Sequence, residues 1–337
     1  MRRSVKLLLL LAALFICLPA AGQKKDSFFR DLDAFFEMRA QKNRAKMDTN
    51  YVDSYDYRWD GSTFVNSTGL HFVSSFGNSL LSTGMVQRVG VGVSYRGLGL
   101  SYSFVVGKKH NSNFTTDIYG KHVGVEFGFQ SATKPYGNID SAYLRYDENG
   151  RIENVRLLST RVTVLYSFNS RFSMDAAMKQ SIIQRRSAGS VIAGLTWAAW
   201  DMLFLGDEET DPVESFLKAN YFYQRFSLGA GYGYNLVFGQ KHWLLHLSLI
   251  PMWTFYEMQG WWESGKRETD SYPFGYITYT GTARTAICFL WGKRWSLGLD
   301  GMINQGSSAN RFSSKAPDYR RFGAQDWKID LSLVCRF

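Results

Sequence analysis

Three things are scarce in this sequence: cysteine, proline and long apolar runs. Cysteine accounts for 3 of the 337 residues and proline for 6. So few cysteines exclude a disulfide-rich secreted domain, and the low proline content leaves long segments free to pair as strands. Beyond the first 22 residues no run of about 18 apolar residues occurs, so we expect no transmembrane helix in the rest of the chain.

Motifs that carry chemistry are missing as well. The sequence has no G-x-S-x-G, H-E-x-x-H or P-loop motif. His242 and His246 share one face of an expected strand, but no Cys, Asp or Glu stands beside them, which favours a lining role over metal binding. We therefore predict no metal site, no cofactor and no enzyme activity. A membrane-embedded hydrolase is a less favoured alternative, because its residues would have to meet from distant segments.

Aromatic residues, glycine and positive charge are abundant. Phe, Tyr and Trp together make up 16% of the chain, and there are 31 glycines. This combination suits β-strands joined by tight turns and ringed by aromatic side chains. The net charge is +10. In an exported chain, such a charge favours contact with lipid phosphates, or an anion-attracting interior, over binding to nucleic acid.

Residues 1–22 have the features of a secretory signal peptide. Basic residues at positions 2, 3 and 6 precede an apolar run over 7–18, and small residues occupy 20–22. This pattern predicts cleavage after Gly22 and export of the mature chain. A lipoprotein anchored through Cys17 is disfavoured, because the residue before that cysteine is not small.

From about Ser67 onward, apolar residues alternate with small or polar ones, as Val89 and Val91 do around Gly90. Segments of about ten residues with one apolar face are typical of membrane barrels. A soluble β-sandwich is disfavoured, because charges stand in mid-strand and very short connections alternate with long polar ones. We therefore predict an all-β fold, a transmembrane antiparallel up-and-down β-barrel over residues 67–337.

About 12 strands are expected, with about 10 to 14 open. In this assignment the long insert over 131–157 lies on the periplasmic side of the membrane. The tight turn at Asn169-Ser170 lies on its outer side. Both conflict with the usual asymmetry of short periplasmic turns and long outer loops. The predicted strands cover 67–77, 84–96, 97–107, 119–131, 158–169, 171–182, 188–201, 224–238, 242–257, 273–290, 294–305 and 325–337.

The C-terminal segment is the strongest single indication of a barrel. Every odd-numbered residue from Trp327 to Phe337 is apolar, and the last one is aromatic. This segment looks like the terminal strand that the barrel-assembly machinery reads in outer-membrane proteins, by pairing with an open edge strand. We predict that Phe337 is the assembly signal. We also expect Cys288 and Cys335 to be reduced and to face lipid, with a disulfide bridge between them as the less favoured alternative.

Residues 23–66 are predicted to be a periplasmic segment. Phe28, Leu32 and Phe35 recur at helical spacing among basic residues, which predicts an amphipathic helix over 24–46. Packing of this helix on or beside the barrel mouth is favoured. The alternative is a helix that lies on the inner face of the outer membrane.

The charged residues that alternate with the apolar ones are candidates for the barrel lining. Side chains of both signs are expected to form ion pairs that fill and stiffen the interior, and this interpretation is favoured over a conducting pore. If a pore exists, the excess of basic residues would favour anions. The candidates are Arg88, Glu126, Arg161, Asp175, Lys179, Arg225, Arg284, Arg294, Asp300, Lys328, Asp330 and Arg336.

Several short stretches resemble an uncharacterised family of outer-membrane proteins from Bacteroidetes-type bacteria, known as a domain of unknown function. The resemblance spans roughly residues 48–337 and rests on the order of these stretches along the chain. It implies an outer-membrane barrel and no activity. The stretches are Asp48-Thr49-Asn50-Tyr51, Tyr166-Ser167-Phe168-Asn169 with Phe172-Ser173, Gln184 to Ser190, and Gly231-Tyr232-Gly233-Tyr234-Asn235.

These observations predict a protein of the outer membrane with a structural or binding role. A small-solute channel is the alternative. The expected partners are outer-membrane lipids and lipopolysaccharide, the barrel-assembly machinery, and a protein or glycan at the outer loops. No nucleic acid is expected.

Overall fold

The computed structural model describes two units of the chain, residues 1–45 and residues 46–337. In the first unit the described residues are helical and lie within the helix predicted over 24–46, whereas the predicted signal peptide lies outside the described residues. No helix in the described ranges is long and apolar enough to cross a membrane. These ranges are 33–35, 37–38, 41–42, 48–55, 57–74, 79–95, 98–105, 112–119, 122–137, 145–204, 221–263, 266–306 and 322–337.

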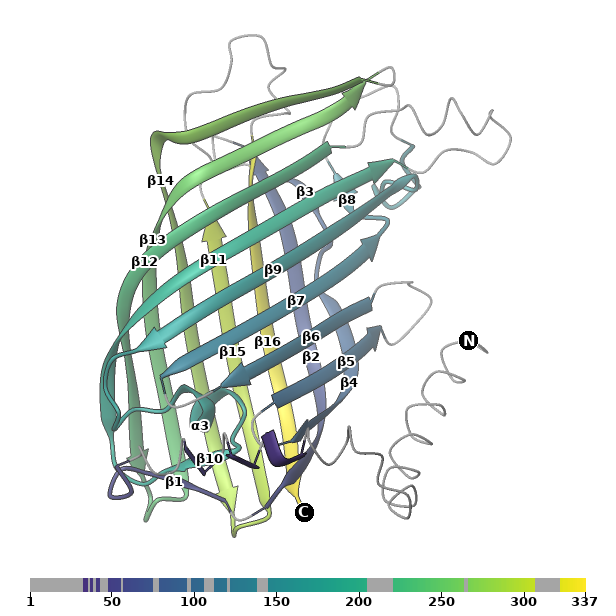
Figure 1. Ribbon diagram of the computed structural model, residues 1–337. Helices are drawn as coiled ribbons and strands as arrows, with labels where there is room; N and C mark the ends of the chain where they lie inside the picture. Colours follow the sequence, from purple (N-terminus) through teal and green to yellow (C-terminus); the bar gives the residue numbers. More distant parts are fainter. Residues whose placement is uncertain are drawn as a thin grey trace. The chain divides into compact units, whose positions relative to one another are not determined.

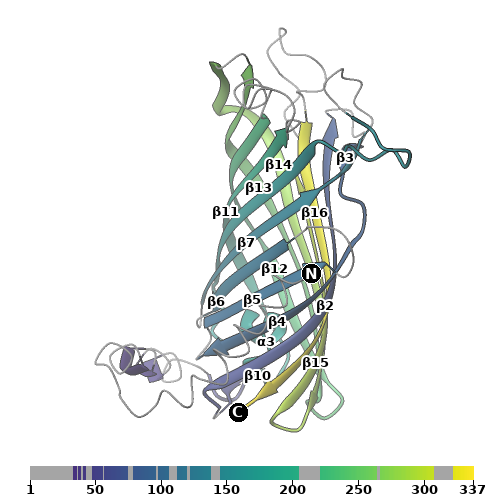
Figure 2. The same cartoon turned by 90° about the vertical axis from the view of Figure 1, so that its right-hand side faces the viewer.

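The second unit is a closed antiparallel β-barrel, as the sequence predicts (Figures 1 and 2). Within the described ranges its wall has 12 long strands, each paired with its neighbours, and β16 pairs with β2 to close the ring. Closure leaves no edge strand unpaired. The strands are β2 (Trp59–Ser74), β4 (Val86–Tyr95), β5 (Leu98–Val105), β6 (Ser112–Tyr119), β7 (Val123–Thr133), β9 (Val155–Ser167), β11 (Ala188–Phe204), β12 (Tyr221–Phe238), β13 (Trp243–Glu263), β14 (Lys266–Trp291), β15 (Trp295–Gly306) and β16 (Phe322–Arg336).

The outer surface of the barrel is apolar. Side chains that point outward include Leu228, Leu249 and Leu331, and each is exposed, Leu249 by 61%. Their neighbours along each strand point inward, and most of them are small or polar, as are Ser227 and Gly229 beside Leu228. So much exposed apolar surface is stable in lipid and not in water, which makes the barrel a membrane protein.

The number of strands agrees with the prediction, but two of the assignments are wrong. The prediction omits β6, whose outward positions alternate Phe114 and Ile118 with hydroxyl residues and so show little apolar contrast. It also places a strand over 171–182, where the chain forms α3 (Met174–Met178). The two errors offset each other in number. The barrel also begins earlier than predicted, because β2 starts at Trp59.

The omission of β6 explains why the insert was predicted on the wrong side, because one missing strand before it reverses the side. β2 begins and β16 ends at the same end of the barrel, where the Trp59 N–H donates to the Phe337 carbonyl at 3.2 Å. The short turns over 239–242 and 292–294 lie at this end, which is therefore the periplasmic end. The segment between β7 and β9 lies at the opposite, outer end (Figure 1). It carries β8 (Tyr136–Gly137), which pairs with β3 (Ser79–Ser82).

The connection between β9 and β11 forms a plug at the periplasmic end (Figure 1). We define the plug as residues 168–187, which contain α3 and β10 (Ile182–Gln184), together with β1 (Val52–Ser54), which pairs with β10. Its apolar side chains, Phe172 and Met174, pack against inward residues of the wall. Period-two apolar spacing in this stretch therefore reflects burial inside the barrel, whereas the prediction attributes it to a lipid-facing strand.

Candidate functional site: the barrel lumen

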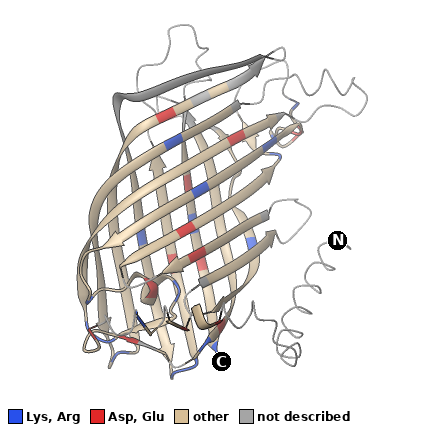
Figure 3. Cartoon of the chain, viewed as in Figure 1, with Lys and Arg blue, Asp and Glu red and all other residues tan. Residues whose placement is uncertain are grey.

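Most of the charged residues predicted to line the lumen lie inside it. Arg88, Arg225, Arg284, Asp330 and Arg336 are buried, and Arg88 has no exposed surface. The cartoon in Figure 3 shows both signs of charge along the strands of the wall. Glu126, Arg161, Asp300 and Lys328 line an internal cavity described below.

Three of the predicted lining residues belong elsewhere in the fold. Asp175 and Lys179 reach the interior from the plug, at α3 and its C-cap, and not from a strand of the wall. Arg294 is exposed in the turn between β14 and β15, where its Nε donates to the Tyr57 hydroxyl at 3.3 Å. Turn residues do not follow the inward-outward alternation of the strands. The alternation along β15 therefore cannot predict the direction of the Arg294 side chain.

The lumen also holds acidic residues that the prediction omits. Asp60, Asp117, Glu257 and Asp326 face inward by their strand register. Asp117 lies on the omitted strand, and Asp60 precedes the predicted start of the barrel. Glu257 faces inward because a bulge between Thr254 and Tyr256 reverses the alternation. Only Asp326 could have been found from the even-numbered row of the C-terminal strand.

With these residues included, acidic and basic side chains balance inside the described part of the barrel. The basic excess that suggested an anion pathway is therefore absent from the described lining of the lumen. The inward acids are Asp60, Asp117, Glu126, Asp175, Glu257, Asp300, Asp326 and Asp330, and the inward bases are Arg88, Arg161, Lys179, Arg225, Arg284, Lys328 and Arg336.

Ion pairs connect opposite walls of the lumen. Arg284 of β14 donates to both carboxylate oxygens of Glu126 on β7, with Nη2 2.7 Å from Oε2. The Tyr119 hydroxyl also donates to that carboxylate. Arg161 of β9 forms an ion pair with Asp326 of β16 through Nη1 and the single carboxylate oxygen Oδ2. Charges buried this deeply are stable only when paired, so these contacts hold a filled layer of side chains across the barrel.

The plug is attached to the wall by polar contacts on several strands. Lys179 of the plug pairs with Asp117 of β6 at 2.5 Å. Asn235 of β12 donates from Nδ2 to the Ser173 carbonyl at 2.7 Å. Arg336 of β16 donates from Nε to the Gln180 carbonyl at 3.2 Å. The attachment points therefore lie around the ring and not on one side of it.

Two sequence expectations about cysteine have different outcomes. Both Cys288 and Cys335 are free thiols. Cys335 shares the outward row of β16 with the apolar residues, as predicted. Cys288 does not face lipid: it is buried against the plug, and its thiol donates to the Ala177 carbonyl at 3.4 Å.

Burial changes the acidity of Asp175 in the plug. Loss of water around this carboxyl raises its pKa from an ordinary value of 3.8 to about 7, and the nearby Asp60 and Asp117 act in the same direction. A hydrogen bond from the Ser181 hydroxyl opposes the shift. The protonated form of Asp175 is therefore the one that fits the closed plug best.

An internal cavity of about 160 Å³ lies above the plug. It exists because the inward positions of the facing wall are small, as at Gly92, Gly99 and Ser101. Charged side chains such as Asp300 and Lys328 form the opposite side. Its volume suits roughly ten water molecules or one small polar ligand.

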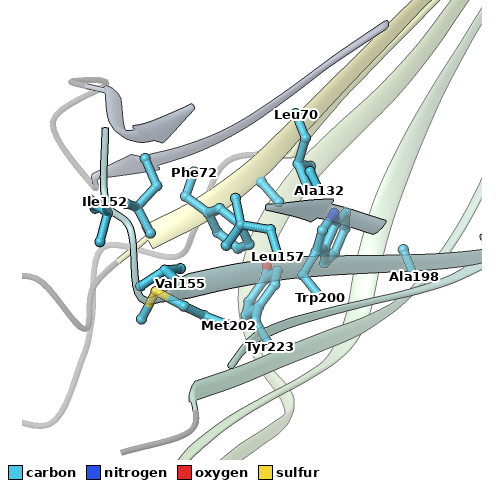
Figure 4. Close-up of a cluster of buried hydrophobic side chains, with 12 residues drawn as sticks. Leu70, Phe72, Ala132, Ile152, Val155, Leu157, Ala198, Trp200, Met202 and Tyr223 are labelled. Atoms are coloured by element: carbon cyan, nitrogen blue, oxygen red, sulfur yellow. The ribbon is translucent and has the colours of Figure 1, made fainter. Parts of the chain in front are cut away.

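Buried apolar side chains form a cluster inside the barrel towards its outer end (Figure 4). Inward residues of β2, β9, β11 and β12 pack there against Leu81 of β3 and Ile152. Trp200 and Tyr223 stack at 5.4 Å between ring centroids, and the Arg225 guanidinium lies 4.8 Å from the Trp200 ring. A cavity of about 10 Å³, room for about one water molecule, lies beside Ala198 and Arg225 below this cluster.

No group of three His, Cys, Asp or Glu side chains in the described ranges is placed to hold a metal ion. Two other predicted features have clear positions. Phe337 is exposed at the seam of the barrel, where its N–H donates to the Trp59 carbonyl at 3.0 Å. The stretch between the predicted strands 242–257 and 273–290 continues β13 and β14, and Glu263 is the cross-strand partner of Lys266.

Comparisons with solved structures concern the fold alone, and no curated protein matches the chain. The COG4313 outer membrane channel from Pseudomonas putida F1 has 10% identity and a TM-score of 0.34, over 83% of this chain and 96% of that one. Ail, the attachment invasion locus protein of Yersinia pestis, has 10% identity and a TM-score of 0.25, over 83% and 99%. The Pseudomonas putida toluene transporter TodX has 6% identity and a TM-score of 0.26, over 83% and 89%.

A family match covers most of the chain. Residues 46–316 match the family described as "Domain of unknown function (DUF4421)". The matched stretch includes the plug and most of the barrel wall. The match bears on the family and not on the bacterial group of origin. This chain, a closed barrel with a lipid-facing surface, is an outer-membrane β-barrel that belongs to the DUF4421 family.

Proposed function

We propose that this protein is a closed outer-membrane barrel with a structural or binding role, and that it does not form a standing pore. The observation that carries the proposal is the filling of the lumen at three levels. The plug occupies the periplasmic end, cross-wall ion pairs such as Arg284–Glu126 occupy the middle, and the apolar cluster around Trp200 occupies the outer end.

Each level opposes the passage of a solute for a different reason. Displacing the plug breaks hydrogen bonds that satisfy buried groups, including those of Asn235 and Arg336. Opening the middle layer separates buried charges. Opening the outer level exposes tightly packed aromatic side chains to water. All three costs would have to be met together for a continuous path.

Conductance of the purified full-length protein in a planar lipid bilayer tests the proposal. We expect no reproducible current steps. An engineered opening gives the positive control: Trp200→Ala with Arg284→Ala and Glu126→Ala, combined with replacement of residues 168–187 by a short turn, removes all three levels. Regular steps from the unaltered protein would contradict the proposal.

A gated small-solute channel is the second candidate, and the polar cavity above the plug favours it. In that case the plug moves and the solute crosses a lumen of balanced charge, so anions and cations pass with similar ease. Gly298 faces the Gln180 side chain, since a Cβ at Gly298 would lie 2.0 Å from Gln180 Nε2. Cysteines at these two positions, in a chain with Cys288 and Cys335 replaced by serine, would lock the plug. Current steps only in the reduced form would favour the gated channel.

The structural or binding role requires contacts with other molecules. The lipid-facing surface provides contact with the membrane. The predicted protein or glycan partner at the outer loops depends on the segments over 205–220 and 307–321, which lie outside the described residues.

A further inference from the structure

Two turns lie side by side at the periplasmic end of the barrel. We call them the rim turns: residues 239–242 join β12 to β13, and residues 292–294 join β14 to β15. β13 and β14 are neighbouring strands, and the Leu290 N–H near the end of β14 donates to the His242 carbonyl at 2.8 Å. The rim turns therefore form one continuous stretch of the barrel edge.

The rim turns carry positive charge and no acidic residue. Lys241, Lys293 and Arg294 are all exposed there. Arg294 is held by the Tyr57 hydroxyl, which leaves its charge unchanged. Within the described ranges no ion pair neutralises either lysine. The charges of the rim turns are therefore available to an anion outside the protein.

The turn that carries Lys241 does not itself call for a lysine. The His242 N–H donates to the Gly239 carbonyl at 3.1 Å, and the two central residues, Gln240 and Lys241, have φ angles of 55° and 71°. Glycine and asparagine are the residues preferred at such positions of a hairpin turn. Turn formation therefore does not explain the lysine, and its charge is the property that needs a role.

Aromatic side chains face lipid directly beside the rim turns. Phe238, Trp243 and Phe289 are cross-strand partners in one outward row of β12, β13 and β14. The Phe238 and Trp243 rings are 12° from parallel, and the Trp243 and Phe289 centroids lie 4.7 Å apart. Trp291 and Trp295 are partners beside the second turn, and Trp291 is 75% exposed. Aromatic rings at a barrel edge lie at the level of the lipid headgroups.

The charge and the aromatic surface together identify one class of ligand. A phosphate group complements the exposed bases, and acyl chains complement the aromatic row next to them. A phospholipid carries both parts in one molecule. An acidic protein or a soluble phosphate would match the bases alone.

We propose that the rim turns are a binding site for an anionic phospholipid of the inner leaflet of the outer membrane. Its phosphate contacts Lys241 and Lys293, and its acyl chains lie on the aromatic row. The site is on the outside of the barrel, so it is open to the membrane and does not depend on whether the lumen conducts. It adds selectivity for lipid charge to the general contact between the apolar wall and the bilayer.

Native mass spectrometry of the full-length folded protein, released from detergent micelles, tests the proposal. The protein is mixed with phosphatidylglycerol, which is anionic, or with phosphatidylcholine of the same acyl chains, which has no net charge. We expect half occupancy at a lower concentration of phosphatidylglycerol. Each base near an anionic headgroup strengthens binding about fivefold, so Lys241→Gln with Lys293→Gln should raise that concentration about 25-fold. Binding of phosphatidylcholine should not change.

Arg185→Gln with Arg186→Gln is the matched control. This double variant removes the same charge from exposed residues of the plug, which are not part of the lipid-facing wall. It should bind phosphatidylglycerol as the native chain does. The mobility of unheated protein on a denaturing gel reports the folding of each variant.

Glycerol phosphate, the soluble counterpart of the headgroup, separates a membrane lipid from free phosphate. We expect no adduct at the concentrations at which phosphatidylglycerol binds. An adduct of glycerol phosphate at those concentrations would overturn the assignment to a lipid. The proposal also fails if the native chain binds both lipids equally, or if the two double variants lose phosphatidylglycerol to the same extent.

Discussion

Arg284 and Glu126 are 158 residues apart in sequence, yet their side chains form a two-fold hydrogen-bonded ion pair across the lumen. The pair joins β14 to β7, which do not neighbour each other in the barrel wall. It therefore acts as a cross-brace inside the ring. This geometry supports the first of four predictions.

Breaking the brace from one side should destabilise the barrel strongly. Arg284→Met leaves the Glu126 carboxylate buried without its partner, at a cost of about 3–5 kcal/mol in the free energy of unfolding. The double variant Arg284→Met with Glu126→Gln should recover much of that loss. Urea unfolding in detergent micelles measures both.

The exposed pair of Lys134 and Glu153 is the matched control for this experiment. Its atoms are 2.9 Å apart, but both side chains are about half exposed, at 50% and 45%. Lys134→Met should therefore change the unfolding free energy by less than about 1 kcal/mol. Equal effects of Lys134→Met and Arg284→Met would contradict the bracing role.

Arg336 should hold the plug in place. Its Nη2 donates to the Ser296 hydroxyl at 2.9 Å, its Nε donates to the Gln180 carbonyl, and its guanidinium lies 3.9 Å from the Tyr55 ring. Arg336→Leu removes these contacts and should loosen the plug. Cys288, which is buried against the plug, should then react faster with a maleimide in a Cys335→Ser background.

Arg185→Leu provides the comparison for the plug experiment. Arg185 also belongs to the plug, but its ion pair with Asp53 is partly exposed, at 47% and 31%. We expect Cys288 to stay protected in this variant. A maleimide rate that is unchanged in Arg336→Leu would show that Arg336 does not secure the plug.

The stability of the plug should decrease as pH rises. The pKa of Asp175 is raised in the folded state to about 7, so the contribution of the protonated carboxyl is complete below its ordinary value of 3.8 and is lost as pH rises through about 7. Asp175→Asn should remove this dependence. At pH above 7 it should stabilise the protein by at most about 4 kcal/mol, since one pKa unit corresponds to about 1.4 kcal/mol.

Comparison of the native chain and Asp175→Asn across this pH range isolates the effect from other carboxyl groups. Maleimide reaction at Cys288 reports the plug itself, with rates extrapolated to a constant thiolate fraction. If the maleimide rates of the two proteins differ by the same factor at low and at high pH, Asp175 is not the source of the pH dependence.

Close approach of β12 and β13 should make Gly231 intolerant of substitution. A Cβ at Gly231 would lie 1.9 Å from the Leu249 carbonyl oxygen, which is backbone and cannot move aside freely. Gly231→Ala should therefore prevent folding or lower stability by several kcal/mol. Gly281→Ala is the control, because no atom lies within 4 Å of its added Cβ. Refolding yield on an unheated gel distinguishes the two, and similar yields would contradict the close approach.

The alternation of residues predicted the wall of the barrel well and the lumen only in part. Strand parity depends on local sequence, so residues such as Arg88 and Asp330 could be placed inside without knowing the fold. Glu257 could not, because a bulge reverses the alternation before it. Asp117 was not predicted because β6 was not. Polar residues at outward positions of β6 weaken the alternation that identifies a strand.

The plug shows a different limit of prediction. Its apolar spacing is that of a strand, and Phe172 and Met174 are as apolar as lipid-facing residues. What distinguishes them is the enclosure of the lumen, which forms only when β16 pairs with β2. Asn235 shows the same dependence, since its amide donates to the Ser173 carbonyl of the plug.

The sequence by itself determined that this chain forms a barrel with an apolar outer surface and a charged interior. That information is local, because each strand carries its own two-residue period. Contact with lipid stabilises the apolar face of each strand directly. Only the tertiary structure decided which charges meet and which end is plugged. Pairs such as Arg284 and Glu126 lie on strands far apart in the chain, and ring closure alone brings them within hydrogen-bonding distance.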